Sequence, residues 1–290
     1  MNAFGAIEAG GTKFVCAVGT GPDDLEFRKI DTTTPDSTIG QVVEFLSGFP
    51  LKAVGIGSFG PVDFKRGVIT STPKAGWRDT PLADRVAAAL GVPVGFDTDV
   101  NAAALGEYRF GAAQGVSDFL YLTVGTGIGG GAMTDGRLIH GLVHPEMGHI
   151  RVPHDPARDP YPGGCPWHGD CLEGLACGPA IGARFEQRAY ELPPDHPFWE
   201  IEAEYLAQAL STWVCTLSPE LIIMGGGVMD QEHLFPRIRA RLLALLGGYI
   251  RAPRITEQID TYVVRARRDA GVLGGLVLAQ QAYERSLQQT

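Results

Sequence analysis

The chain has 290 residues, 44% of them hydrophobic and 20% charged, which is enough for one large domain or for two lobes with separate cores. Acidic residues outnumber basic residues by 33 to 24, and the net charge of −9 argues against nucleic acid as a partner, because phosphate backbones bind basic surfaces. The chain has no apolar run long enough to cross a bilayer and no signal-peptide pattern at its N-terminus, so we expect a cytoplasmic protein with no membrane partner.

The first predicted element is a hairpin with a glycine-rich turn. Phe4–Ile7 and Phe14–Val18 are apolar, and Ala9–Lys13 lies between them. Glycines let backbone N–H groups approach an anion closely, while Thr12 adds a hydroxyl and Lys13 a positive charge. The turn is therefore either an ordinary hairpin turn or a phosphate-binding turn.

The next elements predict an α/β lobe with a mixed sheet. Ile39–Gly48 and Leu82–Leu90 have helical patterns, and Ala53–Ile56 between them is a strand pattern. The strand runs into Gly57–Asp63, where glycine and proline indicate a fixed loop at a sheet edge. This order of strands and helices fits a single lobe.

Carboxylates follow at a strand-to-helix junction. Val92–Phe96 is an apolar strand pattern, Asn101–Tyr108 has helical composition, and Asp97 and Asp99 lie between them. The unpaired N–H groups of a helix N-terminus stabilise a carboxylate by about 0.3–1 kcal/mol. An acid kept ionised there can accept a proton from a bound hydroxyl. The alternative is that Asp97 or Asp99 is simply the N-cap.

A second lobe is predicted to begin like the first. Phe119–Val124 is a strand pattern, followed by the glycine-rich Gly125–Gly131 and by an Asp-Gly hairpin turn at 135–136. The glycines match the string G-x-G-x-x-G, but a dinucleotide site needs a helix directly afterwards, and here a hairpin follows. The shared opening of strand, glycine turn and strand indicates an internal duplication of architecture.

Two further segments close the chain order. Leu221–Met224 is an apolar strand pattern that ends in Gly225–Gly227, before the predicted helix Pro236–Leu246. Such a glycine triplet either lets the backbone approach an anionic ligand or allows helix and strand to pack closely. The last predicted helix, Ala270–Arg285, begins with residues small enough for tight packing.

A histidine and cysteine pattern predicts a structural zinc site. The five cysteines are an odd number in a chain without an export signal, which favours metal binding over disulfides. His149, Cys165, His168 and Cys171 have spacings that let four ligands converge on one tetrahedral ion, and a closed set of four favours a structural role. The alternative is a reduced thiol pair among surface residues.

Other residues near this pattern have separate expectations. Cys16 and Cys215 lie in apolar runs and are expected in the core, and Cys177 is expected on a helix outside the ligand set. Glu146 and Glu173 flank the metal pattern. A carboxylate pair fixed by a metal-bound loop can accept hydrogen bonds from vicinal hydroxyls of a sugar.

Six motifs together resemble one family. They are AGGTK at 9–13, DVNAAALGE at 99–107, GTGIGGG at 125–131, PEMGH at 145–149, CPWHGDCLEG at 165–174 and GGGV at 225–228. With them the chain resembles the ROK family of bacterial sugar kinases and sugar-responsive repressors. The His168-containing loop and SFGPVD at 58–63 resemble its fructokinase branch.

The resemblance implies a fold and a division into domains. The fold is a two-lobed α/β fold of the actin/hexokinase type (ribonuclease H-like) with a zinc-bound loop. Residues 1–111 with 271–290 would form a smaller lobe that carries the catalytic Asp, and residues 112–270 a larger lobe with the zinc loop. A homodimer is also implied.

The resemblance also implies roles for individual residues. Asp99 matches the catalytic base, and the sugar-binding matches are Asn101, Glu146, His149 and Glu173. The nucleotide-binding matches are Gly10, Gly11, Thr12 and Lys13, Gly125, Thr126, Gly127 and Gly129, and Gly225, Gly226 and Gly227. Mg²⁺ is expected with ATP, and Glu8 stands where the wider fold often has an Asp near this ion.

The implied activity is ATP-dependent phosphorylation of a hexose, with fructose and its 6-hydroxyl as the first expectation. Lobe closure would exclude water as a competing acceptor. Glucose, mannose or an N-acetylated hexose is the alternative substrate. A sugar-binding regulator is the alternative without catalysis, although family repressors carry a DNA-binding head before AGGTK and this turn begins at residue 9.

Overall fold

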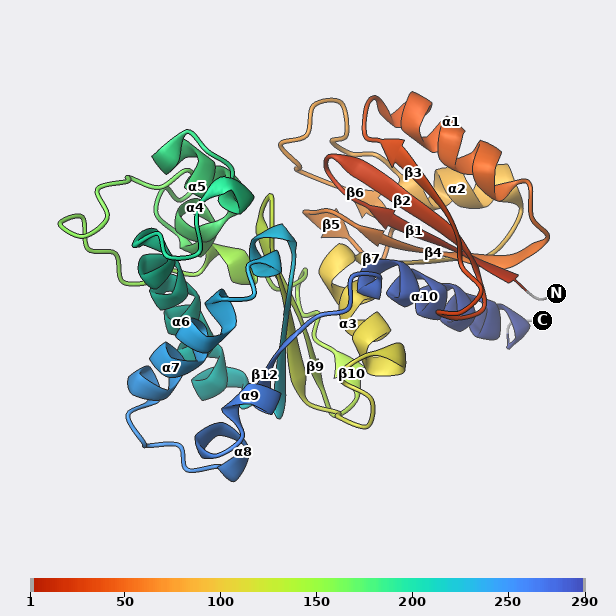
Figure 1. The fold of residues 1–290 in the computed structure, drawn as a ribbon. Helices are drawn as coiled ribbons and strands as arrows, with labels where there is room; N and C mark the ends of the chain where they lie inside the picture. The colour runs from red at the N-terminus through yellow and green to blue at the C-terminus, as the bar shows by residue number, and fades with distance from the viewer. Residues whose placement is uncertain (1–2, 289–290) are drawn as a thin grey trace. The chain divides into compact units, whose positions relative to one another are not determined.

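The computed structural model describes residues 3–288 as two compact units (Figure 1). The first contains the chain up to Gly115, the segment Ile139–His144 and the chain from Arg267 onward, and the second contains Val116–Leu138 and Pro145–Ala266. The predicted boundaries after residue 111 and before residue 271 lie within a few residues of the divisions after Gly115 and before Arg267. The segment Ile139–His144 differs from the prediction, because its contacts place it in the first unit.

The first unit is built on a five-stranded mixed sheet with the order β3-β2-β1-β4-β7. Its strands are β1 (Ala3–Ala9), β2 (Lys13–Gly19), β3 (Glu26–Asp31), β4 (Leu51–Ser58) and β7 (Val94–Thr98). β1 and β2 form the predicted antiparallel hairpin, and β1, β4 and β7 run parallel. The carboxyl ends of these three strands therefore meet at one edge of the sheet.

Helices cover both faces of this sheet (Figure 1). α1 (Pro35–Leu46) and α2 (Leu82–Leu90) share an apolar core with β1, β2 and β4 on one face. α3 (Asp99–Phe110) and α10 (Ala270–Leu287) lie on the other, where α10 packs on small residues such as Ala6 and Ala53. A short hairpin of β5 (Val62–Asp63) and β6 (Val68–Ile69) completes the unit.

The contact between α3 and α10 depends on glycine. A Cβ atom at Gly274 would lie 1.5 Å from the carbonyl oxygen of Ala102, and one at Gly106 would lie 2.1 Å from the carbonyl oxygen of Ala270. Backbone therefore touches backbone, as the small residues at the start of α10 predicted. The close fit fixes the helix that begins with Asp99.

The second unit repeats the sheet pattern with the order β10-β9-β8-β11-β12. Its strands are β8 (Phe119–Val124), β9 (Ile128–Thr134), β10 (Arg137–Leu138), β11 (Leu221–Gly225) and β12 (Val263–Arg265). β8, β9 and β10 are antiparallel neighbours, and β8, β11 and β12 are parallel, as in the first unit. The predicted duplication of architecture is confirmed at the level of topology.

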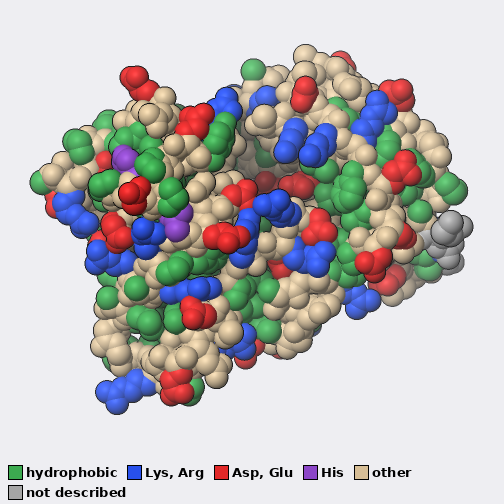
Figure 2. Space-filling model, in the orientation of Figure 1, with side chains coloured by type: hydrophobic (Ala, Val, Ile, Leu, Met, Phe, Trp, Pro, Cys, Tyr) green, Lys and Arg blue, Asp and Glu red, His purple; other side chains and the backbone are tan. Residues whose placement is uncertain are grey.

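The helices of the second unit include α6, the longest, with 20 residues. The helical elements are η1 (Met147–His149), α4 (Leu172–Ala176), α5 (Gly178–Phe185), η2 (Ala189–Glu191), α6 (Phe198–Leu217), η3 (Gly227–Asp230), α7 (Leu234–Leu246), α8 (Pro253–Thr256) and α9 (Ile259–Tyr262). Among the described residues no helix has both the length and the apolar character to cross a membrane. Figure 2 shows acidic and basic side chains interspersed over the face in view, so the net negative charge is not gathered in one patch there.

Two of the three cysteines outside the metal pattern, Cys215 and Cys177, differ from their predicted positions. Cys16 is buried as predicted, but Cys215 is exposed because it lies on the outer side of the last turn of α6, whereas Trp213 and Val214 face inward. Cys177 is buried, but it lies between α4 and α5 as a cap of both and not within a helix.

Candidate active site

The junction of β7 and α3 presents Asp99 at the first position of a 12-residue helix. The N-cap is Thr98, whose Oγ1 accepts a hydrogen bond from the Asn101 amide at 3.1 Å. Thr98 therefore fills the capping role that the alternative gave to Asp97 or Asp99. The partly exposed carboxylate of Asp99 lies at the positive end of the helix, with its Oδ1 2.9 Å from the Val100 amide.

Asp97 is the buried partner of this junction. Its Oδ1 accepts hydrogen bonds from the Thr98 amide at 2.8 Å and from Asn101 Nδ2 at 2.7 Å, and its Oδ2 lies 2.8 Å from His140 Nε2. Asn101 is only 1% exposed. An amide that is buried and already bonded suits the support of Asp97 better than direct contact with a sugar, so the assignment of Asn101 to sugar binding stays a prediction.

The glycine turn of the first unit lies at the same sheet edge. In the sheet, Ala9 pairs with Ser58, and Ser58 pairs with Thr98, so the turn after β1 and the start of α3 follow neighbouring strands. Within the turn the Gly10 amide donates to the Lys13 carbonyl at 3.0 Å. Gly11, Thr12 and Lys13 are exposed, as an anion-binding turn requires.

Glu8 precedes this turn on β1. Burial raises the pKa of its carboxyl, and the nearby Lys13 opposes this shift only in part. A cation bound beside this carboxyl would oppose the effect of burial, so a contact of Glu8 with Mg²⁺ stays a prediction.

The two glycine turns of the second unit lie side by side. Thr123 of β8 pairs with Gly225 of β11, so the turns that follow the two strands are neighbours. Gly226 has a φ of +91°, and a Cβ atom there would lie 2.4 Å from the Val124 carbonyl oxygen. Only glycine suits this position, which brings Gly225–Gly227 beside the turn at Gly125.

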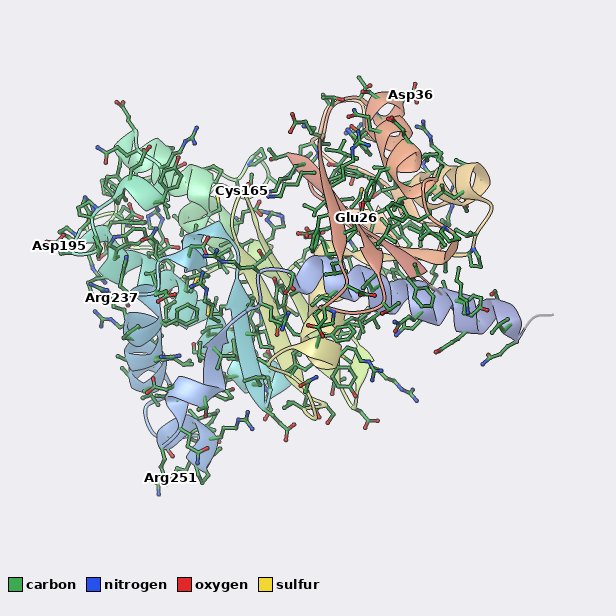
Figure 3. All side chains as sticks on the ribbon, turned by 45° about the vertical axis from the view of Figure 1, so that its right-hand side comes forward. Glu26, Asp36, Cys165, Asp195, Arg237 and Arg251 are labelled. Atoms are coloured by element: carbon green, nitrogen blue, oxygen red, sulfur yellow. The ribbon has the colours of Figure 1, made fainter. Side chains whose placement is uncertain are left out.

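The four residues of the predicted metal site, which we call the zinc set, converge. Their ligand atoms all lie within 4.8 Å of one another, and Cys165, labelled in Figure 3, lies in the loop between η1 and α4. Cys165 Sγ is 3.8 Å from His149 Nδ1 and 3.6 Å from His168 Nδ1, and Cys171 Sγ is 3.5 Å from His149 Nδ1. A tetrahedral zinc with ordinary Zn–S and Zn–N bonds separates a sulfur from a nitrogen ligand by about 3.5 Å. The donor atoms present therefore fit zinc.

The predicted sugar ligands of the second unit surround the zinc set. Glu173 Oε1 is 4.0 Å from His149 Nε2, and Glu173 Oε2 accepts a hydrogen bond from the Ile128 amide at 2.9 Å. The carboxylate is thus fixed between the metal loop and the glycine-rich start of β9. Glu146 is exposed at the cap of η1, and its carbonyl accepts a hydrogen bond from the His149 amide at 3.0 Å.

The structure therefore groups the predicted residues within each unit. Asp99, Asn101 and the first glycine turn belong to the first unit, and Glu146, the zinc set, Glu173 and the other two glycine turns belong to the second. Sequence patterns missed the capping role of Thr98 and the pairing of Asp97 with His140. No motif signals that pairing, because 43 residues separate the two side chains in the chain.

Comparisons with known proteins agree over nearly the whole length. A model of the ROK family matches residues 4–282. The chain is 42% identical to a fructokinase of Pediococcus pentosaceus, over 97% of this chain and 99% of that protein. It is 40% identical to a fructokinase of Lactococcus lactis subsp. cremoris, over 97% and 98%.

The fold is shared with the crystal structure of a ROK family glucokinase from Streptomyces griseus in complex with glucose and AMPPNP. That chain has 30% sequence identity and a TM-score of 0.79, and the match covers 97% of this chain and 100% of the other. The predicted α/β fold of the sugar-kinase type is thereby confirmed.

Proposed function

Because the chain belongs to the ROK family, we propose that it is an ATP-dependent sugar kinase that transfers the γ-phosphoryl group of ATP to the 6-hydroxyl of fructose. One observation carries the choice of sugar. Relatives named as fructokinases reach identities of 40% and 42% over nearly their full length, whereas the glucokinase of known structure has 30%. Glucose is the second candidate, because that glucokinase has this fold and contains glucose.

Asp99 is the general base of the proposal. The proposed transfer passes through a loose transition state in which alignment and charge neutralisation matter more than covalent assistance. The negative charge of a carboxylate at the start of a capped helix is stabilised by the helix dipole, and the direction of this carboxylate is set by the backbone there. It can accept the proton of the sugar hydroxyl as the bond to phosphorus forms.

The glycine turns and the acids near the zinc set take the remaining roles. The three turns bind the nucleotide through backbone N–H groups, as an acidic protein must if it is to bind phosphate locally. Mg²⁺ enters with ATP as part of the substrate and neutralises phosphate charge. Glu173 and Glu146 accept hydrogen bonds from sugar hydroxyls, and His149, whose Nδ1 lies beside the cysteine sulfurs of the zinc set, donates to a sugar oxygen through Nε2.

Zinc has a structural role in this proposal. Four protein ligands leave no open position on the ion, so it orders the loop and does not react. It fixes His149, a ligand that lies beside Glu173.

A homodimer and a cytoplasmic location remain predictions, and sedimentation of the purified protein would test the predicted dimer.

A hexose panel with measured ADP release tests the activity. Fructose should give the highest kcat/KM, and faster turnover of glucose or mannose would overturn the choice of fructose. Asp99→Asn should lower kcat by about 10²–10⁴-fold while fructose still binds. The matched control is Asp84→Asn, an exposed acid in the first turn of α2, which should keep wild-type activity. Turnover of Asp99→Asn at the rate of this control would refute the role of Asp99.

A further inference from the structure

His140 belongs to a short segment, Ile139–His144, that packs in the first unit although the chain on both sides of it belongs to the second; we call this segment the excursion. Ile139–His144 follows β10 of the second unit, and the chain returns to the second unit at Pro145. Two histidines attach this excursion to the carboxyl edge of the first sheet. His140 reaches Asp97 near the end of β7, and His144 Nε2 accepts a hydrogen bond of 3.2 Å from the amide of Val62, the first residue of β5.

The ring of His140 is fixed on two sides. Its plane stacks on Phe64, with ring centroids 4.3 Å apart and an angle of 28°. Its Nε2 faces Asp97 Oδ2 at 2.8 Å, and because an ionised carboxylate can only accept, this nitrogen donates. Asn101 Nδ2, at 3.4 Å from the same nitrogen, is a second donor to Asp97 and not a partner of the histidine.

Asp97 needs this donor. The residue is 5% exposed, and its Oδ1 is already occupied by the Thr98 amide and the Asn101 side chain. Loss of the bond from His140 would leave Oδ2 buried without its donor, and a buried carboxylate that loses a partner is strongly destabilised. Any rotation of the carboxylate toward another donor would weaken its bonds to the Thr98 amide and to Asn101 Nδ2.

Those two bonds hold the backbone around Asp99. Thr98 precedes it and Asn101 follows two residues later, and Asp97 contacts both. The direction of the Asp99 carboxylate depends on this backbone, because the residue is the first of α3. A shift of about 1 Å in a reacting group can lower a rate by about 10²-fold.

We propose that His140 is a positioning residue of the kinase reaction: through Asp97 it fixes the start of α3 and thereby the direction of Asp99. The inference rests on the proposed role of Asp99 as the base. It assigns this part in the reaction to the His140 side chain alone and not to the whole segment Ile139–His144.

Three variants separate the hydrogen bond from other effects. His140→Leu removes the donor and keeps an apolar contact for Phe64, whereas His140→Gln can place an amide N–H near the position of Nε2. His144→Leu is the matched control, because it loosens the other attachment of the same excursion. We expect His140→Leu to lower kcat by about 10–100-fold with the KM for ATP unchanged, His140→Gln to recover most of the rate, and the control to stay near wild type.

Hydrogen exchange gives a readout that needs no activity. His140→Leu should speed exchange of the amides from Thr98 to Asn101, and His144→Leu should leave them protected. Equal exchange in His140→Leu and the wild type, equal losses in both leucine variants, or a kcat of His140→Gln as low as that of His140→Leu would overturn the proposal. If the wild type phosphorylates no hexose, the proposed function fails, while hydrogen exchange still decides whether His140 holds the start of α3.

Discussion

Replacing Gly274 with Ala should test whether the contact of α10 with α3 fixes the helix that begins with Asp99. The added Cβ atom would lie 1.5 Å from the Ala102 carbonyl oxygen and 2.2 Å from its carbon, and both are backbone atoms of α3 that cannot rotate away. Overpacking of this kind costs about 1–3 kcal/mol. Alanine regains about 1 kcal/mol from its higher helix propensity; because the clash is with backbone atoms, we expect the cost near the upper end of that range and a net loss of up to about 2 kcal/mol.

The matched control is the same substitution in an open position. Gly40 is an exposed residue of α1, and a Cβ atom there would meet no heavy atom within 4 Å. Gly40→Ala should therefore raise the free energy of unfolding by about 0.5–1 kcal/mol. In urea unfolding, the midpoint should fall for Gly274→Ala and rise for Gly40→Ala. A midpoint for Gly274→Ala at or above the wild-type midpoint would refute the argument, and a lower kcat is expected along with the lower stability.

Three further predictions concern buried carboxylates and zinc. Glu202 is fully buried, neither of its carboxyl oxygens has a hydrogen-bond partner among the described residues, and burial raises its pKa well above the usual value. The free energy of unfolding should therefore fall as the pH rises above about 4.5, because the unfolded chain loses this proton first. Glu202→Gln should flatten this pH dependence in urea unfolding measured from about pH 5 to pH 9. Glu107 accepts hydrogen bonds from the backbone amides of Ala112 and Arg267. In Glu107→Gln the side-chain NH₂ would face one of these N–H donors, so the free energy of unfolding should fall by about 1–3 kcal/mol in thermal unfolding. The exposed Glu44→Gln is the control and should leave it unchanged. Removing the metal of the zinc set with a chelator should loosen the 149–171 loop and weaken fructose binding in calorimetry, and an unchanged affinity once metal analysis finds no zinc would contradict the link.

The local elements of the fold were predictable because turns and strands leave short-range patterns. The glycine turns at 10–11 and 125–127 and the Asp-Gly turn at 135–136 fall between paired strands in the structure. The four residues of the zinc set were predictable for the same reason, because ligand spacing is local once the loop folds back. The resemblance to the ROK family supplied the roles of single residues, which spacing alone does not give.

Contacts between residues distant in the chain determined the features that local sequence patterns did not predict. Asp97, Thr98 and Asp99 are all acceptable caps, and the pairing of Ser58 with Thr98 extends β7 far enough to make Thr98 the cap. No predicted element covered α6, although its buried positions, such as Trp199, Leu206 and Trp213, recur at helical spacing along one broad face. The partnership of Asp97 with His140 depends on the excursion of the chain into the first unit, for which no local pattern exists.

The order of the chain has a consequence for biosynthesis, because α10 leaves the ribosome only after the entire second unit. Until then β1 and β4 lack the helix that covers Ala6 and Ala53, and α3 lacks its closest neighbour. The nascent first half must therefore wait with this face of its sheet covered by α3 alone. A chain cut before Arg267 would keep both sheets but would leave the part of that face that α10 covers permanently open to water or to another polypeptide.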